Sequence, residues 1–334
     1  MASELHSIRC SRLTKRYRIK QREEGTLSAV ASLFKSHYKT VTAIRDVDFT
    51  VAAGESVGLL GGNGAGKTTL LRMLAGVIAP TRGSINAAGY VPSDHRYAYL
   101  QDISLMMGQK GQLQWDIPVV ESFRLHQAIY NVTDSDYRSR LASLIDALGI
   151  EPYLSKPTRS LSLGERMRCE VAKALLHAPR MLFLDEPTIG LDPDVQRQLR
   201  TYLRRYCQER GASLLLTSHN IRDIEELCPR VIALGEGAII YDGSFRGLIE
   251  RHRPGGKLNV SVAAADASTL EACCSARGLA LENAGEGEYM IVIPETEFGP
   301  VLHWLSEQVT LLKMSRGEPR TEDVVADLYQ QSGM

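Results

Sequence analysis

The nine residues GGNGAGKTT at positions 61–69 decide the fold of this 334-residue chain. They match the pattern G-x-x-x-x-G-K-[ST], in which glycines let successive backbone N–H groups close around phosphate groups. Apolar runs at residues 55–60 and 69–75 flank the loop, so we expect it to join a strand to the N-terminus of a helix. The positive end of the helix dipole would then face the phosphates. The phosphate-binding candidates are Gly61, Gly62, Asn63, Gly64, Ala65, Gly66, Lys67, Thr68 and Thr69.

A second motif, LFLDEPT at residues 182–188, has the pattern of a buried apolar strand that ends in two carboxylates. At such a position Asp185 would hold Mg²⁺ and Glu186 would activate an attacking water. Lys67 would add positive charge, and Thr68 a hydroxyl ligand for the same Mg²⁺. Taken alone, the two carboxylates would be ordinary for a solvated strand end. Together the two motifs predict hydrolysis of a nucleoside triphosphate.

The composition, with 44% hydrophobic and 23% charged residues, is typical of a soluble globular protein. The formal net charge is zero, so no basic field attracts nucleic acid, and we expect no nucleic-acid partner. No apolar run reaches the roughly 18 to 20 residues that span a bilayer, and the N-terminus lacks a secretory pattern. We therefore expect a cytosolic or peripheral protein. The six cysteines form no C-x-x-C pair and are expected to be reduced core thiols.

Hydrophobic periodicity predicts an α/β fold with a central parallel sheet, helices on both faces and an antiparallel start. Continuous apolar runs, such as residues 181–184 and 214–216, are typical of strands that are buried on both faces. The expected strands are residues 7–11, 43–51, 55–60, 99–107, 181–185, 213–217, 230–234 and 237–241. The expected helices are residues 67–77, 119–131, 135–149, 162–177, 193–210 and 220–227.

The pattern breaks at residues 251–256, RHRPGG, which indicates a domain boundary. The expected domains cover residues 1–250 and 257–334. From Lys257 the pattern predicts, in order, a strand, a helix (266–276), two strands (the second 289–293), a helix (297–307), a strand (309–314) and a last helix (321–330). This order is close to a ferredoxin-like α+β domain. No catalytic constellation lies in it, which leaves packing, dimer contact and partner contact as its alternative roles.

Between the two phosphate motifs lies SLSLGERMR at residues 160–168, followed by an apolar, helix-forming run to Leu176. The order of phosphate loop, glutamine-containing segment, L-S-x-G-x, Asp-Glu and then His resembles the ATP-binding cassette (ABC) family over roughly residues 6 to 246. The resemblance implies a phosphate-loop NTPase core, an antiparallel β subdomain and a helical subdomain over about residues 110–175. It also implies ATP and Mg²⁺ as the bound species.

In that family the L-S-G-G-Q segment of one subunit covers the γ-phosphate held by the other subunit, and here Ser162 and Gly164 would do so. The chain departs from the family pattern at Leu163 and Glu165, and a carboxylate near phosphate would slow turnover unless it points away. Ser162 and Glu165 also form S-x-x-E, a capping box that starts a helix. The two interpretations are compatible.

Three further residues take roles from the resemblance. Gln109 would contact Mg²⁺ or the attacking water and sense the transport partner, with Gln112 and Gln114 as competitors. His219, after the apolar strand 213–217, would contact the γ-phosphate; a packing or capping role is the alternative. Asp192 would support the opposite subunit's site, and before Pro193 it is equally a helix N-cap.

An aromatic ring is expected to stack on adenine. Tyr17 matches the family pattern at the end of the first strand, whereas Tyr38 better matches the usual distance to the phosphate loop. Residues 18–37 are interpreted as an insertion between the two, and we favour Tyr17 because an insertion can follow a strand end without moving it.

The resemblance implies an ATPase subunit whose nucleotide sites form when two cassettes meet head to tail, with a second copy of this chain as the expected partner. Residues 108–119 and 161–169 are similar to ATPase subunits of bacterial exporters that pair with ABC-2 type permeases. That similarity implies a separate permease chain and a place at the cytoplasmic face of the inner membrane. The alternative is a cassette ATPase that remodels a ribosome or nucleic-acid complex; it is disfavoured because neither a second phosphate loop nor an extended heptad pattern is present.

Overall fold

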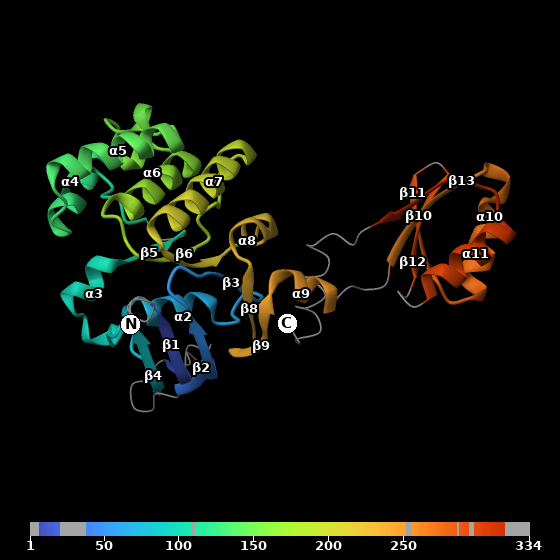
Figure 1. The fold of residues 1–334 in the computed structure, drawn as a ribbon, viewed down its shortest axis with the longest axis horizontal. Helices are drawn as coiled ribbons and strands as arrows, with labels where there is room; N and C mark the ends of the chain where they lie inside the picture. Colours follow the sequence, from blue (N-terminus) through green and yellow to red (C-terminus); the bar gives the residue numbers. More distant parts are fainter. Residues whose placement is uncertain are drawn as a thin grey trace, which may run out of the picture. The chain divides into compact units, whose positions relative to one another are not determined.

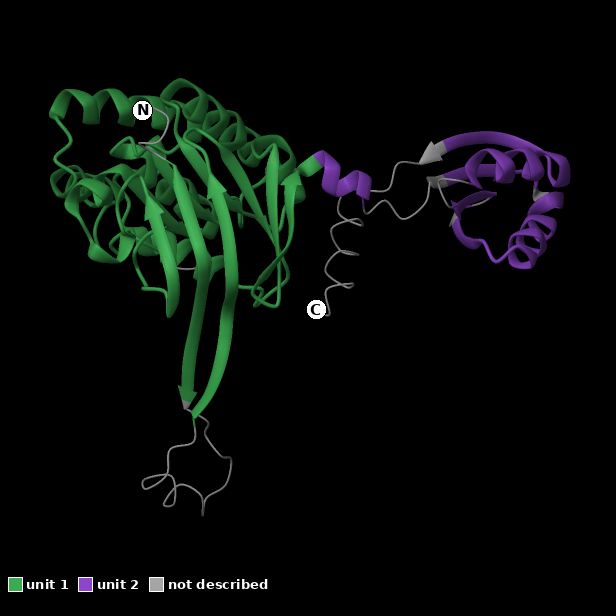
Figure 2. Ribbon diagram, turned by 60° about the horizontal axis from the view of Figure 1, so that its bottom comes forward, with its two compact units in different colours: residues 1–245, 332–334 green, residues 246–331 purple. Residues whose placement is uncertain are grey.

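The computed structural model describes residues 7–20, 38–108, 111–251, 256–285, 287–293 and 297–317. The chain forms two compact units that divide after Phe245, within a few residues of the break in the sequence pattern (Figure 2). Each unit is described here by itself. In the described part of the chain, no helix has both the length and the apolar character needed to cross a membrane.

A six-stranded sheet forms the centre of the first unit, in the order β5-β6-β7-β3-β8-β9. All neighbouring pairs are parallel except β8 with β9. The bounds are β3 (Ser56–Leu60), β5 (Ile103–Met107), β6 (Met181–Asp185), β7 (Ser213–Thr217), β8 (Arg230–Gly235) and β9 (Ala238–Ser244). The predicted α/β fold with a mainly parallel sheet is confirmed, because apolar strands such as β6 and β7 can be buried on both faces.

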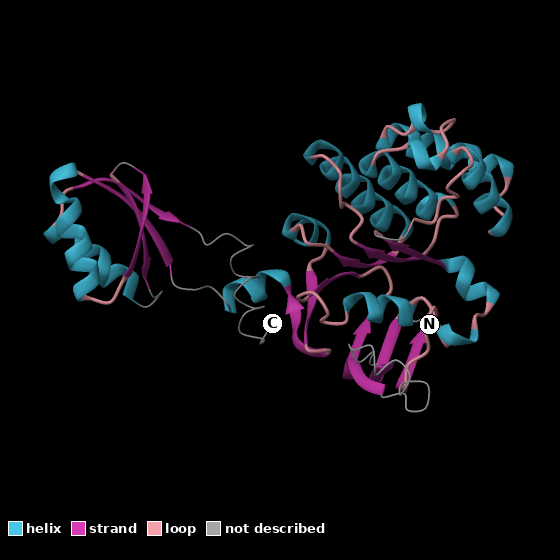
Figure 3. Ribbon diagram, turned by 180° about the vertical axis from the view of Figure 1, so that it is seen from behind, coloured by secondary structure: helices cyan, strands magenta, loops and turns pink. Residues whose placement is uncertain are grey.

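Helices cover both faces of this sheet (Figure 3). Helix α2 (Lys67–Leu74) lies between the central sheet and a second, antiparallel sheet, and its buried Leu70 and Leu74 share one core with Phe183 and Ile85 (Figure 1). Helices α6 (Leu163–Leu176), α7 (Pro193–Arg210) and α8 (Ile221–Leu227) lie on the opposite face. The layers place the N-terminus of α2 at the carboxyl edge of the sheet, where α/β folds bind ligands.

The antiparallel sheet has the order β2-β1-β4, formed by β1 (Ile8–Lys20), β2 (Tyr38–Val51) and β4 (Arg82–Ala87). The sequence pattern missed β4 and predicted β1 and β2 too short. Both strands continue past β4 as a two-stranded ribbon that pairs Lys20 with Tyr38 (Figure 2). The first residues of the predicted insertion, 18–20, are therefore strand, and residues 21–37 lie outside the described part.

One predicted strand is partly wrong. Residues 97–102 form helix α3 (Tyr97–Asp102), and β5 begins only at Ile103, whereas the sequence predicted a strand from residue 99. The reason is tertiary: Tyr99 is fully buried and its hydroxyl donates to the carbonyl of Leu74, at the end of α2. An aromatic run has high strand propensity, and this contact overrides it.

The helical subdomain consists of α4 (Val119–Ile129), α5 (Asp134–Leu148) and α6, which packs on both of the others. Short 3₁₀ turns lie at Pro92–Asp94, Glu151–Tyr153, Thr158–Ser160 and Ala264–Asp266. Helix α9 (Phe245–Arg251) spans the division between the units. The six cysteines are free thiols and five of them are buried, as expected from their sequence spacing.

The second unit has a four-stranded antiparallel sheet in the order β11-β12-β10-β13. Its elements are β10 (Gly256–Val262), α10 (Ala267–Ala276), β11 (Ala280–Gly285), β12 (Glu288–Ile293), α11 (Phe298–Gln308) and β13 (Leu311–Gly317). This β-α-β-β-α-β order with the first strand at the centre is the ferredoxin-like arrangement. Its own core includes Val260, Leu270, Ile291 and Leu305. The predicted helix at 321–330 lies outside the described residues.

Candidate functional site

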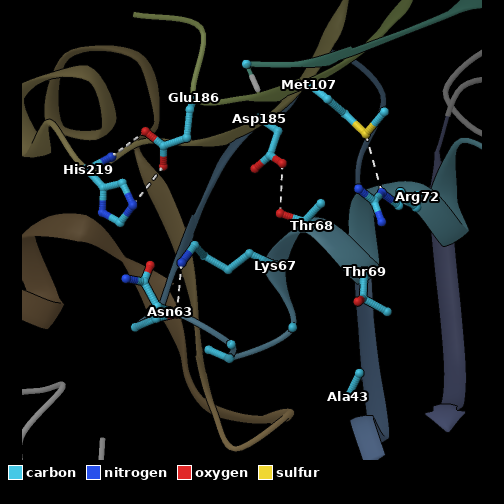
Figure 4. A pocket seen from close by; sticks show the side chains of 15 residues that line it. Ala43, Asn63, Lys67, Thr68, Thr69, Arg72, Met107, Asp185, Glu186 and His219 are labelled. Carbon is cyan, nitrogen blue, oxygen red and sulfur yellow. Dashed lines mark hydrogen bonds and ion pairs between the residues drawn. The ribbon is translucent and has the colours of Figure 1, made fainter. Parts of the chain in front are cut away.

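A pocket of about 270 Å³ lies where the phosphate loop meets the carboxyl ends of β6 and β7. It brings together most of the residues that the sequence singled out. The lining consists of residues 62–69 with Ala43, Arg72, Met107, Gly108, Asp185, Glu186 and His219. Five segments that are far apart in the sequence therefore meet at one site (Figure 4).

The phosphate loop is closely packed against the strands around it. Gly61 has a φ of 148° and Gly66 a φ of 105°, and residues other than glycine rarely adopt this backbone conformation. A Cβ on Gly61 would lie 2.6 Å from the carbonyl oxygen of Leu234 in β8, and one on Gly66 would collide with the carbonyl of Ala43 in β2. The loop leads directly into α2 at Lys67, so the free N–H groups of this helix N-terminus face the pocket.

Lys67 lies inside the pocket with its ammonium group on the loop itself. Nζ donates to the carbonyl oxygens of Gly61 at 2.5 Å and Gly62 at 3.1 Å. Burial lowers the pKa of Lys67, and the nearby carboxylates of Glu186 and Asp185 oppose that shift. A phosphate group in the pocket would offer this partly buried cation a stronger, charge-assisted partner than a carbonyl.

Asp185 is held by two hydroxyl groups. Thr68 Oγ1 donates to one carboxylate oxygen at 2.8 Å, and Thr217 Oγ1 donates to the other at 2.6 Å. Thr68 comes from the start of α2 and Thr217 from the end of β7. The pair of Thr68 and Asp185 thus presents two hard oxygen atoms at one point of the pocket wall, the donor type that Mg²⁺ prefers.

Glu186 and His219 face each other across the carboxyl ends of β6 and β7 (Figure 4). The backbone N–H of His219 donates to Glu186 Oε2 at 2.9 Å, and His219 Nε2 lies 3.7 Å from Glu186 Oε1. Glu186 has a φ of 56°, a strained value for a non-glycine residue, and its N–H donates to the carbonyl oxygen of Thr217 at 3.1 Å. Burial raises the pKa of Glu186, while the contact with His219 opposes the shift. A raised pKa brings a carboxylate closer to the range of a useful general base.

Ser162, Gly164 and Asp192 lie outside this pocket and close to one another. Ser162 caps α6: its hydroxyl accepts from the N–H of Glu165 at 3.3 Å, and the Glu165 carboxylate accepts from the N–H of Ser162 at 2.8 Å. The capping box is thus formed, and its backbone hydrogen bond lowers the pKa of Glu165. The Glu165 carboxylate therefore points back onto its own helix start.

The start of α6 packs against the loop that leads to Asp192. A Cβ on Gly164 would lie 2.8 Å from the carbonyl oxygen of Gly190, so the two backbones are in close contact. Asp192 caps α7 by accepting from the N–H of Val195 at 3.0 Å, and its second oxygen pairs with Arg168 of α6 at 3.0 Å. We call this region, residues 162–165 and 190–192, the α6–α7 surface.

The adenine candidates lie on the β1–β2 ribbon. Tyr17 pairs with Val41, two residues from the pocket residue Ala43, whereas Tyr38 lies five residues from Ala43. Five strand residues span about 16 Å, so Tyr38 is the more distant ring. Neither tyrosine belongs to the pocket lining.

Among the glutamine candidates, Gln109 lies outside the described residues. Its competitor Gln112 donates from Nε2 to the carbonyl oxygen of Leu105 at 2.5 Å and does not line the pocket. The backbone N–H of Gln114 donates to Ser122 Oγ at 3.1 Å, beside α4.

Sequence reasoning missed Thr217, which holds Asp185, and Met107 and Arg72, which line the pocket and contact each other at 3.4 Å. The position of Thr217 was a usable signal, because it ends the apolar strand next to β6. Met107 and Arg72 have no such signal in the sequence, since only the fold brings them to the pocket.

Comparison with known proteins supports the interpretation of this pocket. A family model described as "ABC transporter" matches residues 44–189. The chain is 32% identical over 228 residues to the ABC transporter ATP-binding protein NatA of Bacillus subtilis, covering 68% of this chain and 92% of NatA. It is 35% identical over 231 residues to Nod factor export ATP-binding protein I of Rhizobium johnstonii, covering 68% of this chain and 73% of that protein.

The fold also matches solved cassettes. A dimeric structure of the ATP-binding cassette MJ0796 in a post-hydrolysis state with ADP and Pi aligns with a TM-score of 0.59 at 21% identity, covering 71% of this chain and 98% of that one. The family that the motifs predicted is confirmed: the chain belongs to the ABC transporter ATP-binding proteins and is an ATPase of the cassette type.

Proposed function

We propose that two copies of this chain meet head to tail, hydrolyse ATP with Mg²⁺ at two shared sites, and drive a separately encoded ABC-2 type permease as an exporter. One observation carries the proposal. The pocket holds Lys67, Asp185, Glu186 and His219, whereas Ser162, Gly164 and Asp192 lie together on the α6–α7 surface outside it. One chain thus carries two complementary halves of a site, and a head-to-tail pair joins each pocket to the other copy's α6–α7 surface.

The residues of the pocket divide the chemistry among them. The loop N–H groups, the start of α2 and Lys67 bind the phosphates and stabilise negative charge on the transferred phosphoryl group. Glu186, with its raised pKa, accepts a proton from the attacking water, and His219 lies against it where it can contact the γ-phosphate. Gln109 keeps its proposed role toward Mg²⁺ and water.

Thr68 and Asp185 fit a Mg²⁺ ion because their oxygen atoms are 2.8 Å apart at the pocket wall. When bound there, Mg²⁺ would neutralise charge on the phosphates. The aromatic contact with adenine is assigned to Tyr17, since the strand register places it nearer the pocket than Tyr38. These assignments make one chain sufficient for both halves of the site, which supports a homodimer.

The helical subdomain offers a surface for the permease. Several apolar side chains of α3, α4 and the segment before α4 are exposed, and we call them the α3–α4 apolar surface: Tyr97, Trp115, Ile117, Leu125 and Ile129. Asn131, just after α4, donates to the hydroxyl of Tyr97 at 2.7 Å, so the two helices are joined. A cytoplasmic segment of the permease would bury this surface.

Export is proposed from the relatives, one of which carries the name Nod factor export ATP-binding protein. Attachment to a permease would place the chain at the cytoplasmic face of the inner membrane. The transported substrate would contact the permease, so no residue of this chain is assigned to it.

Glu186→Gln tests the catalytic proposal. The amide keeps the shape of the side chain but is a poor base, so we expect ATP turnover to fall at least about 100-fold while ATP binding persists. The variant is expected to elute as an ATP-dependent dimer in size-exclusion chromatography. The control is Glu186→Gln combined with Ser162→Arg, which places a bulky charge on the α6–α7 surface and should keep the chain monomeric with ATP. Wild-type turnover in Glu186→Gln would contradict the role of Glu186.

Affinity purification from detergent-solubilised membranes tests the partner. We expect the tagged chain to retain a polytopic permease, and Trp115→Glu with Ile129→Glu to lose it while ATPase activity of the purified chain is kept. Recovery of ribosomes or nucleic acid without a membrane protein would instead support the remodelling alternative.

A further inference from the structure

A carboxylate that does not reach the pocket joins the two loops beside the Glu186–His219 pair. Asp223, on α8, has no exposed surface. Thr188 Oγ1 and Ser218 Oγ both donate to its Oδ2 at 2.6 Å, and Arg200 of α7 pairs with its Oδ1 at 2.9 Å. A buried charge with this many partners has its geometry fixed from several sides at once.

The two hydroxyl donors flank the proposed catalytic pair. Thr188 lies two residues after Glu186, in the loop that leads to Asp192, and Ser218 directly precedes His219. One buried carboxylate therefore holds the loop after β6 and the loop after β7 at a set separation.

Gln196 of α7 makes a second connection between the same two loops. Its Nε2 donates to the carbonyl oxygens of Thr188 at 3.4 Å and Leu191 at 3.2 Å. Its Oε1 accepts from Asn220 Nδ2 at 3.0 Å, and Asn220 in turn caps α8 through Arg222 N–H. An amide can serve both loops because it carries donors and an acceptor together.

We propose that Asp223 and Gln196 are positioning residues for ATP hydrolysis: they hold residues 188–191 and 218–220 as one body and so set the geometry of Glu186 and His219. Neither belongs to the pocket lining, and the Asp223 side chain has no exposed surface. This inference rests on the proposed function and extends it to two residues outside the pocket. Because residues 190–192 form part of the α6–α7 surface, these contacts also link the side that meets the second cassette to the catalytic pair of the same chain.

Conservative substitutions at the partners test the inference without leaving Asp223 unpaired. Thr188→Val keeps the side-chain shape and removes one donor to Asp223, which retains Ser218 and Arg200. Gln196→Glu still accepts from Asn220 but cannot donate to the loop carbonyls. The matched controls are Thr201→Val and Gln198→Glu, at exposed positions of α7, where the Thr201 hydroxyl donates to the carbonyl oxygen of Arg197 in its own helix. Thr188→Ser restores the hydroxyl.

Full-length variants are compared in kcat, KM, ATP affinity and melting temperature. We expect Thr188→Val and Gln196→Glu to lower kcat by about tenfold or more with KM and ATP affinity changed less than about twofold, because positioning affects the transition state rather than ground-state binding. Thr188→Ser and both controls should stay within about twofold of the wild-type kcat.

Three results would overturn the inference: kcat unchanged in Thr188→Val and Gln196→Glu, Thr188→Ser as slow as Thr188→Val, or a kcat loss matched by lost ATP affinity or melting temperature. The failure of the proposed function has a different signature. A wild-type chain without ATPase activity, or a Glu186→Gln variant without an ATP-dependent dimer, would overturn both.

Discussion

At the scale of single residues, two adjacent carboxylates take different roles because their surroundings differ. Asp185 accepts hydrogen bonds from two hydroxyl groups and lies at the end of a regular strand, which fixes both of its oxygen atoms at the pocket wall. Glu186 turns into a left-handed backbone conformation, and burial raises its pKa. These different surroundings are consistent with the proposed roles, in which Asp185 holds the metal ion and Glu186 acts as the general base.

Lys67→Ala is expected to weaken ATP binding rather than turnover alone, since it removes a charge-assisted contact with phosphate. Such contacts contribute about 1.5 to 3 kcal/mol, so the dissociation constant should rise roughly 10-fold to 100-fold. A fluorescent ATP analogue titrated into the purified chain measures it. Lys39→Ala, on the exposed ribbon, is the control and should bind like the wild type. Unchanged affinity in Lys67→Ala would contradict the phosphate-loop role.

At the scale of elements, the contact of α4 with α6 contains a buried pair of histidines. His126 Nε2 and His177 Nδ1 are hydrogen-bonded at 2.9 Å, and His177 Nε2 bonds the carbonyl oxygen of Ile103 at 2.9 Å. The ring of Tyr130 packs on both imidazoles. Burial lowers the pKa of His126 to about 3 and that of His177 to about 4, with a smaller contribution from Lys173.

These histidines should make the first unit sensitive to acid. Their folded pKa values lie below the unfolded value of 6.5, so the unfolded state binds more protons, and stability is lost as pH falls from 6.5 toward about 4. At pH 5 each histidine accounts for about 2 kcal/mol of the loss. Urea unfolding at pH 7 and pH 5, followed by Trp115 fluorescence in a Trp304→Phe background, measures it.

Replacing both histidines, with His126→Gln and His177→Gln, should flatten this pH dependence even if overall stability falls. His303→Gln, an exposed histidine of the second unit, should leave it unchanged. If the double variant lost as much stability between pH 7 and pH 5 as the wild type, the histidine pair would not be the cause of the acid sensitivity.

At the scale of the whole molecule, nucleotide binding belongs to the first unit. Every residue of the pocket lies before the division after Phe245, and the second unit has a core of its own. A chain ended after Arg251 is therefore expected to bind ATP with an affinity within about twofold of the full chain. Isothermal titration measures it, and the same truncation with Lys67→Ala is the control. Lost binding in the truncated chain would mean that the second unit supports the pocket.

The sequence by itself determined the parts of this protein whose physics is local. The phosphate loop, the capping box at Ser162 and Glu165, and the apolar strands β6 and β7 were all predictable, because glycine spacing, side-chain capping and continuous hydrophobicity act within a few residues. The ferredoxin-like order of the second unit followed from the same periodicities.

Only the tertiary structure decided what depends on distant contacts. Helix α3 exists because Tyr99 packs beneath α2, and β4 because β1 offers it an edge, although neither segment has a strong pattern of its own. The contact of Thr217 with Asp185 and the burial of Asp223 between two loops join residues that the sequence holds far apart. The separation of Ser162 from the pocket likewise follows from how α6 and the phosphate loop are packed, and the proposed head-to-tail pair rests on that separation.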